Sequence, residues 1–177
     1  MVQLLIEGTG IRGISRVLRI SLPTVIERIK RITKAIQKPY SFLRNRIYEI
    51  DELWTYIGKK TNEVWIMYMI DRHTKSVIDF RVGSRTKENI QTLTGQVLYM
   101  HPKRICTDGL NIYRSLVPGE VHHTGQLSAR HIERKNLSMR THLKRLNRKT
   151  ICFSRSKEML EACLRIYFWG QPNLIKI

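Results

Sequence analysis

Residues 64–70 have the sequence Val-Trp-Ile-Met-Tyr-Met-Ile, which is the longest unbroken apolar run in a chain of 177 residues. A membrane-spanning helix needs about 20 apolar residues, so this run is too short to cross a bilayer. It suits a β-strand that is buried on both faces. Turn-forming sequences border it at residues 58–62 and 71–75. The run therefore predicts the central strand of a sheet.

Strand-forming sequences lie on both sides of this run, at residues 47–57 and 76–82. Together the three segments predict an antiparallel meander. Apolar periodicity then predicts a helix at 86–100, a strand at 103–107, a helix at 112–117 and a strand at 120–123. The order βββαβαβ, followed by helices, predicts a mixed α/β fold of the RNase H-like kind.

Residues 1–36 have the pattern of three short helices with a tight turn before the third. Ser21 suits the N-cap of the third helix, and Pro23 suits its first turn. We interpret this small all-α module as a helix-turn-helix, whose third helix would enter the major groove of DNA. Thr24, Arg28 and Arg31 would then lie on the exposed side and contact bases or phosphates. A plain helical hairpin with a solvated basic face is the alternative.

The formal net charge of +18 is unevenly distributed. Residues 1–50 carry a net +7, residues 51–120 a net +2, and residues 121–177 a net +9. A nearly neutral core between two cationic flanks suits an enzyme that holds a polyanion such as nucleic acid from both sides. Selection for solubility alone is the competing explanation, although it would favour an even spread. Docking on an anionic membrane is weaker, because the basic N-terminal stretch lacks large aromatic anchors.

Three separated acids occupy positions that suit metal-ion chemistry. Asp51 lies within the first strand, Asp108 ends the fourth, and Glu133 begins a basic helical segment at 131–148. The first and fourth strands are neighbours in the expected topology, so Asp51 and Asp108 can meet, and a helix packed across them would bring in Glu133. Carboxylates without Cys or His ligands fit Mg²⁺ or Mn²⁺. Two such ions, about 3.5–4 Å apart, stabilise the attacking and leaving oxygens of a phosphodiester.

The segment 131–148 also carries cations at helical spacing. Glu133, Arg140 and Lys144 share one expected helix face, so Arg140 and Lys144 would hold the DNA backbone beside the acids. A second face is apolar and expected to be buried, with Ile132, Met139, Leu143 and Leu146.

Other acids and histidines compete for a functional role. Glu52, Asp71 and Asp79 are the rival carboxylates. Asp71 lies in an expected hairpin turn and Asp79 in an expected exposed alternation, so both rank lower. The pair His122-His123 suits a strand edge better than a metal site. The three cysteines are scattered and suit reduced thiols.

Four motifs carry a family resemblance: Asp51-Glu52-Leu53-Trp54, Thr107-Asp108-Gly109, HIERKNLSMR at 131–140 and RKTICFS at 148–154. With them, most of residues 47–170 resembles the insertion-sequence-one family of bacterial DDE transposases. The resemblance implies an RNase H-like catalytic domain in which Asp51, Asp108 and Glu133 form the metal-binding DDE triad. Arg140 matches the basic residue that follows the glutamate, and Asn136 belongs to the same signature as a further DNA-contacting candidate.

The resemblance also implies an activity and its partners. Members cleave DNA at the terminal inverted repeats of the element and join the freed 3′-OH ends to target DNA, as a homo-oligomer on paired ends. Full-length members carry a zinc ribbon ahead of the helix-turn-helix, and the residues before position 11 hold no Cys or His. We therefore expect that the ribbon was lost or that it lies upstream.

These expectations give a domain plan. Residues 1–36 form the DNA-binding module, 37–46 a linker, 47–170 the catalytic domain, and 171–177 a tail. The short apolar stretch at the N-terminus is interrupted by Glu7 and two glycines, which is not the pattern of a signal peptide. We therefore expect a cytoplasmic, nucleoid-associated protein without membrane contact.

Two rival functions remain open. His131-Ile132-Glu133-Arg134 satisfies the H-x-x-R pattern of a tyrosine recombinase, with Tyr167 as the nucleophile of a metal-free, covalent mechanism. That hypothesis leaves Asp51 and Asp108 without a role. The other rival is a catalytically inactive DNA-binding regulator.

Overall fold

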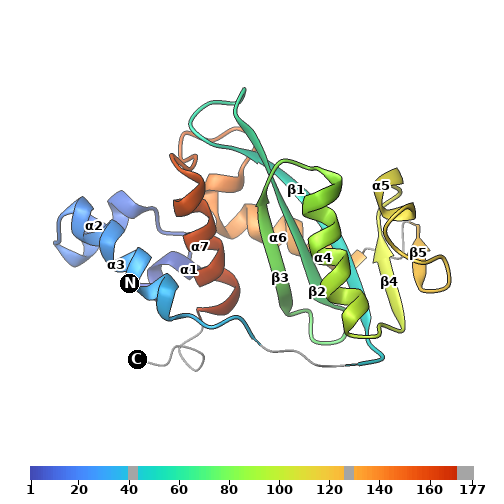
Figure 1. Cartoon of the computed structure of the whole chain (residues 1–177). Coiled ribbons are helices and arrows are strands. Elements are labelled where there is room, and N and C mark those ends of the chain that lie inside the picture. The colour runs from blue at the N-terminus through green and yellow to red at the C-terminus, as the bar shows by residue number, and fades with distance from the viewer. Residues whose placement is uncertain (40–43, 126–129, 171–177) are drawn as a thin grey trace. The chain divides into compact units, whose positions relative to one another are not determined.

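The computed structural model describes residues 1–39, 44–125 and 130–170, and Figure 1 shows its elements. Part of the expected linker and the expected tail, residues 40–43 and 171–177, lie outside the described residues. The described chain forms two compact units. One contains the sheet, with residues 44–55, 63–125 and 130–137, and the other contains residues 1–39, 56–62 and 138–170.

The first unit contains a five-stranded mixed sheet with the order β3-β2-β1-β4-β5. The strands β2 and β3 pair antiparallel, whereas β4 pairs parallel with both β1 and β5. This arrangement confirms the expected mixed α/β class and the expected adjacency of the first and fourth strands. The strand bounds are β1 Ile47–Tyr56, β2 Glu63–Asp71, β3 Val77–Gly83, β4 Arg104–Thr107 and β5 His122–Thr124.

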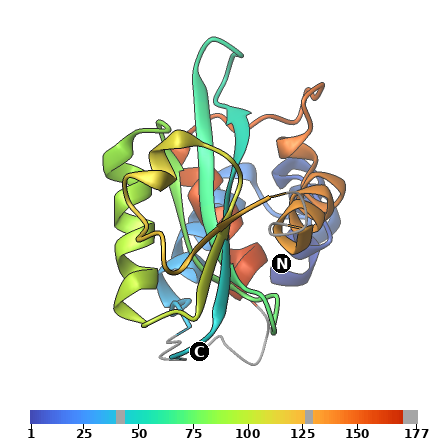
Figure 2. The same cartoon turned by 90° about the vertical axis from the view of Figure 1, so that its right-hand side faces the viewer.

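Helices cover both faces of the sheet (Figures 1 and 2). On one face lies α4 (Lys87–Tyr99), which the hydroxyl of Thr86 caps, followed along the chain by the short α5 (Asn111–Arg114). Their apolar side chains pack with alternate residues of the strands into one core. On the other face lies the first part of α6 (Arg130–His142), residues 130–137. The sheet is therefore buried on both sides, as the apolar sequence of β2 predicts.

The expected helix at 131–148 is shorter in the structure. The helix α6 ends at His142, and a 3₁₀ turn, η1 (Lys144–Leu146), follows Leu143. Leu143 and Leu146 are buried as expected. Their three-residue spacing fits an α-helix and a 3₁₀-helix equally well, which is why periodicity did not locate the end. The prediction that Lys144 shares an α-helical face with Glu133 is therefore wrong.

The second unit is mainly helical. Its helices are α1 (Val2–Ile6), α2 (Ile11–Leu18), α3 (Leu22–Ala35) and α7 (Lys157–Trp169), together with the end of α6. Ser21 caps α3 as expected, since its Oγ accepts the Thr24 N–H. Three residues separate α2 from α3, and Arg19 takes a left-handed conformation at the end of α2.

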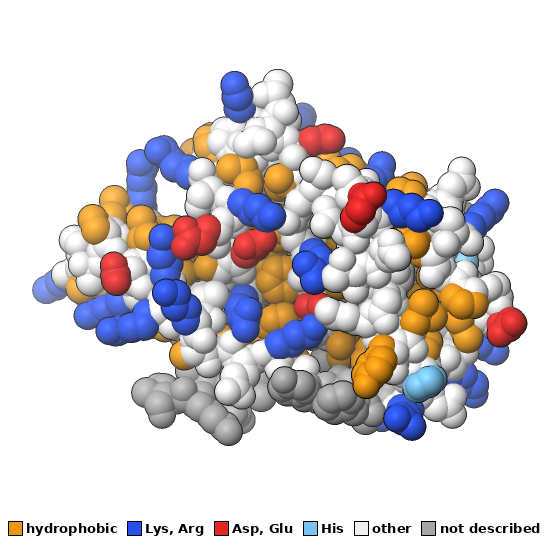
Figure 3. Space-filling model, viewed as in Figure 1, with side chains coloured by type: hydrophobic (Ala, Val, Ile, Leu, Met, Phe, Trp, Pro, Cys, Tyr) orange, Lys and Arg blue, Asp and Glu red, His pale blue; other side chains and the backbone are white. Residues whose placement is uncertain are grey.

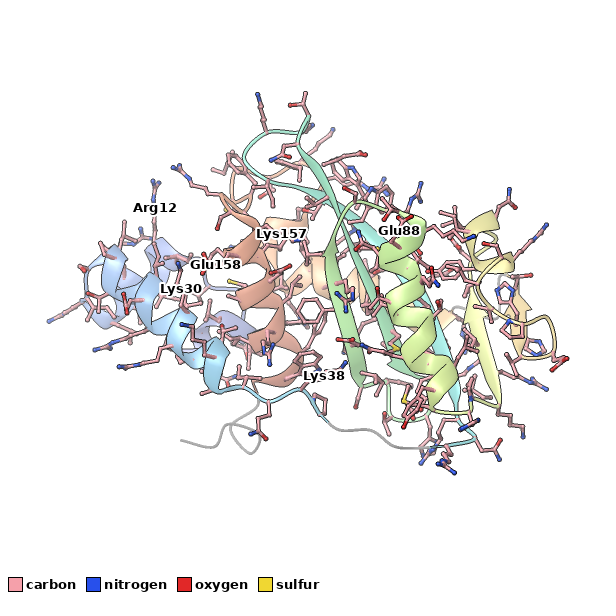
Figure 4. All side chains as sticks on the ribbon, in the orientation of Figure 1. Arg12, Lys30, Lys38, Glu88, Lys157 and Glu158 are labelled. Atoms are coloured by element: carbon pink, nitrogen blue, oxygen red, sulfur yellow. The ribbon has the colours of Figure 1, made fainter. Side chains whose placement is uncertain are left out.

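The helix α7 packs against α1 and α3. Lys30 on α3 lies 3.0 Å from Glu158 on α7, and Figure 4 shows the two side chains meeting between the helices. Arg165 of α7 donates two hydrogen bonds to the carbonyl of Ile36, the C-cap residue that follows α3. Within residues 1–39, 44–125 and 130–170, no helix is both long and apolar enough to cross a membrane.

Candidate functional site

The parallel register of β1 and β4 brings two of the predicted acids together. Tyr48 pairs with Ile105 and Glu49 with Cys106. Continuing this register by two residues places Asp51 beside Asp108, just after β4 ends. Asp51, Glu52 and Asp108 each offer a carboxylate oxygen within 4.8 Å of the other two. Among the described residues, this acidic trio is the one group of three or more His, Cys, Asp or Glu side chains arranged to hold a metal ion.

Asp51 is the most constrained member of the acidic trio. Its Oδ1 accepts the Glu52 N–H at 2.7 Å, and its Oδ2 accepts Nδ2 of Asn136 at 2.6 Å. Burial raises the pKa of Asp51 to about 6, and the negative charges of Asp108 and Glu133 add to the rise, while the two hydrogen bonds lower it. A carboxylate crowded in this way favours a nearby cation.

Glu52 joins the site from the opposite face of β1. Its side chain is 9% exposed, and Oε1 accepts the hydroxyl of Tyr113. Burial raises the pKa of Glu52 to about 7, with Asp108 and Asp51 adding to the rise. Burial and the Glu52 charge also raise the pKa of Tyr113, so its hydroxyl remains a donor.

From the sequence alone, Glu52 is only a rival carboxylate. Adjacent strand residues point to opposite faces, so alternation along β1 does not place Glu52 in the same site as Asp51. Asp108 lies just beyond the end of β4, and from there its carboxylate comes within 4.8 Å of both Asp51 and Glu52, which point to opposite faces of β1. Glu52 could therefore be recognised as a candidate site residue from its place next to Asp51, at the point of β1 that pairs with the end of β4.

Asp108 itself is exposed, and a local turn holds it. Its Oδ1 accepts the Leu110 N–H at 3.0 Å, which leads the chain into α5. Thr107 donates its hydroxyl to the Asp108 carbonyl, and His122 Nε2 lies 2.8 Å from the same hydroxyl. His122 thus supports the end of β4.

Glu133 lies in the first turn of α6 and is exposed. It does not belong to the acidic trio, yet it is close enough for its charge to raise the pKa of Asp51. The start of α6 is fixed by Glu49, whose fully buried carboxylate accepts the Ile132 N–H at 2.8 Å. The same carboxylate lies 2.8 Å from His131 Nδ1 and 3.3 Å from Arg72 Nε. This anchor determines where α6 presents Glu133.

Of the three predicted DNA contacts in the segment 131–148, Asn136 and Arg140 make hydrogen bonds within the protein, and Lys144 is exposed. Asn136 uses both ends of its amide within the protein, because Tyr68 donates its hydroxyl to Asn136 Oδ1 at 2.9 Å. Arg140 donates to the carbonyl of Leu146 at 2.7 Å and so ties η1 to α6. Lys144 is exposed on η1.

The predicted contacts in the N-terminal helices lie on α3. Arg28 and Arg31 are exposed there, and Thr24 shares a 2.7 Å hydrogen bond with the capping hydroxyl of Ser21. Figure 3 shows Lys and Arg side chains gathered over α2 and α3 on the visible face. On α3, Val25 and Ile29 are buried, whereas Ile26 is exposed.

The rival acids and the rival nucleophile occupy structural positions. Asp71 is fully buried, and its Oδ1 accepts the backbone N–H groups of His73 and Thr74 in a turn. Asp79 is 8% exposed, so the expectation of an exposed position was wrong. The hydroxyl of Tyr167 lies 2.8 Å from His142 Nδ1, and burial raises the pKa of that hydroxyl.

A family model described as IS1 transposase matches residues 46–170. The chain belongs to the IS1 transposase family. It is 38% identical over 115 residues to the insertion element iso-IS1n protein InsB of Shigella dysenteriae, covering 65% of this chain and 88% of that protein. It is 34% identical over 119 residues to the insertion element IS1 protein InsB of Shigella flexneri, covering 67% of this chain and 91% of that protein.

Among solved structures, the chain resembles one in the cryo-EM structure of the simian T-cell lymphotropic virus intasome in complex with PP2A regulatory subunit B56 gamma. The TM-score is 0.44 at 16% identity, over 71% of this chain and 53% of that chain. Membership of the IS1 family, and not this weak similarity, makes the chain a transposase.

Proposed function

We propose that this transposase cleaves DNA at the ends of its insertion sequence and joins the 3′-OH ends to target DNA by two-metal-ion phosphoryl transfer, with Asp51, Asp108 and Glu133 as the catalytic, metal-binding triad. The observation that carries the proposal is the convergence of Asp51, in the middle of β1, and Asp108, just after the parallel strand β4 ends, within 4.8 Å of Glu52. The proposal includes an RNase H-like catalytic domain at residues 47–170.

The donor set fits Mg²⁺ or Mn²⁺. The acidic trio supplies hard oxygen ligands with no sulfur or imidazole among them. When bound, the ions would activate the attacking hydroxyl and neutralise the leaving oxygen. The residues themselves orient the site: the Glu52 N–H and Asn136 hold Asp51, the Leu110 N–H holds Asp108, and α6 presents Glu133.

The basic segments would hold the DNA. In this proposal residues 1–36 act as a helix-turn-helix, with Thr24, Arg28 and Arg31 on its exposed side, and residues 37–46 link it to the catalytic domain. Arg140 and Lys144 contact phosphates, and a homo-oligomer assembles on the paired inverted repeats. If α3 contacts DNA, Arg28→Ala reduces the slope of log K against log [salt] by about 1.

The test is strand nicking of insertion-sequence ends in Mg²⁺. Asp108→Ala should fold, retain DNA binding and lose nicking by at least about 10³-fold, because it removes one acid of the triad. The control is Glu88→Gln, which removes an exposed acid of α4, labelled in Figure 4, and should nick at the parental rate.

Other outcomes decide against the proposal. Parental nicking by Asp108→Ala refutes the triad. A covalent protein–DNA adduct lost in Tyr167→Phe supports the recombinase mechanism instead. A parent protein that binds the ends without nicking them in Mg²⁺ or Mn²⁺ is the inactive regulator.

A further inference from the structure

The amide of Asn136 joins two strands of the sheet to α6. Its Nδ2 donates to Asp51 Oδ2 on β1 at 2.6 Å, and its Oδ1 accepts the hydroxyl of Tyr68 on β2 at 2.9 Å. Tyr68 is fully buried, and its hydroxyl also lies 3.2 Å from the carbonyl of Ile132, one turn earlier on α6. The three side chains therefore form one continuous hydrogen-bonded row.

The chemistry of the row fixes which way the amide points. An ionised carboxylate only accepts hydrogen bonds, so the amide nitrogen has to face Asp51. The amide oxygen then has to face Tyr68, whose hydroxyl supplies the donor. A flipped amide would set its oxygen against the carboxylate of Asp51 and lose that hydrogen bond, whereas the Tyr68 hydroxyl could accept from the amide nitrogen and donate to the Ile132 carbonyl.

We propose that Asn136 is a positioning residue that, together with Tyr68, fixes the carboxylate of Asp51 in the metal-binding geometry. This inference rests on the proposed function, in which Asp51 is a metal ligand, and it replaces the role of Asn136 as a DNA contact. The hydrogen bonds from Asn136 and from the Glu52 N–H use one lone pair on each oxygen of Asp51. The two hydrogen bonds hold the carboxylate of Asp51 in one orientation, and its remaining lone pairs stay available to a metal ion.

The same helix carries a second acid of the proposed triad. Asn136 follows Glu133 by three residues on α6, so the two side chains lie on neighbouring positions of one helix surface. The helix that presents Glu133 thus also orients Asp51. Glu49 anchors its first turn to β1, which sets the position of both residues together.

The experiment measures Mn²⁺ binding to the full-length protein without DNA, by calorimetry and by electron paramagnetic resonance of free Mn²⁺. Asn136→Ala should weaken Mn²⁺ binding by about 10–100-fold, as expected when the partner that orients a metal ligand is lost. Tyr68→Phe keeps the buried ring and should weaken binding in the same direction by a smaller factor. The double variant should bind no more weakly than Asn136→Ala alone, because Tyr68 acts through Asn136.

Matched controls separate this effect from general damage to the fold. Tyr48→Phe removes another buried hydroxyl of the sheet, one that lies 3.6 Å from Met100 Sδ, and Asn89→Ala removes an amide of α4 that donates to the Ser84 carbonyl. Both controls should bind Mn²⁺ like the parent. Tyr68→Phe still provides the test if Asn136→Ala does not fold.

Three results would overturn the inference. Parental Mn²⁺ affinity in both Asn136→Ala and Tyr68→Phe, with only a lower melting temperature, makes the row purely structural. Parental Mn²⁺ affinity with weaker metal-free DNA binding makes Asn136 a DNA contact. If Asp51→Asn also binds Mn²⁺ like the parent, the proposed metal site is wrong, and the inference about Asn136 is wrong with it. If Asp51→Asn weakens Mn²⁺ binding and Asn136→Ala does not, the metal site stands and only the inference about Asn136 is wrong.

Discussion

The two faces of β1 are one residue apart in sequence and use different chemistry. On the face that meets α6, Glu49 and Asp51 make directional hydrogen bonds. On the opposite face, Tyr48 and Ile50 are fully buried in the apolar core with α4 and α5, and Glu52 follows at the edge. The hydrophobic effect is non-directional and stabilises the sheet, whereas buried hydrogen bonds are directional and add little net stability. The comparison shows that one strand can separate stability from positioning.

The largest expected effect on stability comes from the apolar face. Ile50→Ala should lower the free energy of unfolding by about 4 kcal/mol, because the side chain is fully buried and its removal leaves a cavity. Urea denaturation measures this loss. Mn²⁺ affinity of the folded fraction should stay at the parental value; a large drop in that affinity would show that the two faces are not separate.

The next effect comes from the polar face at Glu49. Glu49→Gln should lower the free energy of unfolding by about 2–3 kcal/mol, because Arg72 and His131 lose a buried charged partner. It should also weaken Mn²⁺ binding, since α6 loses its anchor. Denaturation and Mn²⁺ titration of the same sample check both changes. A stability loss without any change in Mn²⁺ affinity would contradict a positioning role for this anchor.

A third prediction concerns the pH dependence of stability, which involves Asp51 on one face of β1 and Glu52 on the other. Their pKa values rise from 3.8 to about 6 and from 4.5 to about 7 on folding, so between about pH 4 and pH 7 the folded state binds more protons than the unfolded chain. The free energy of unfolding of the metal-free protein should therefore fall as pH rises through this window. Adding Mg²⁺ at pH 8 should restore the free energy of unfolding that is lost.

Denaturation at pH 5 and pH 8 in EDTA measures this change. The double variant Asp51→Asn, Glu52→Gln is the reference, because it lacks both titrating groups and should lose less stability over the same interval. An equal fall in parent and double variant would assign the pH dependence to other groups.

The smallest effect is expected at Tyr113. Tyr113→Phe removes the hydrogen bond that lowers the pKa of Glu52, so this pKa should rise above about 7, with about 1 kcal/mol lost in stability. Carboxyl-carbon NMR titration of Glu52 measures the shift. The pKa of Asp51 should move much less, and an equal movement of both would show that the two faces titrate as one unit.

Much of this arrangement is predictable from sequence. The run at 64–70 predicts a central strand, and the expected adjacency of the first and fourth strands predicts that Asp51 meets Asp108, which the register of β1 and β4 confirms. Alternation along a strand does not reveal that Asp108, at a strand end, is also within reach of Glu52. The burial of Asp79 was missed because alternation suggested an open face, whereas helices lie on both faces of the sheet.

The hydrogen-bond partners were also beyond sequence reasoning. Asn136 carries a motif signal, but nothing in the motif indicates that Tyr68, more than 60 residues earlier, supplies its second hydrogen bond. Such pairs depend on the register between a helix and a sheet, which neither propensity nor periodicity specifies.

The register of β1 against β4 has a consequence for how this chain tolerates changes in length. Deleting one residue before Asp51 within β1 would exchange the directions of Asp51 and Glu52, because side chains alternate along a strand. Asn136 would then face the wrong neighbour, and Tyr113 would lose its acceptor. Strand β1 therefore admits substitutions but no insertions or deletions, and the turn at residues 57–62 is where variation in length leaves the geometry of the acids intact.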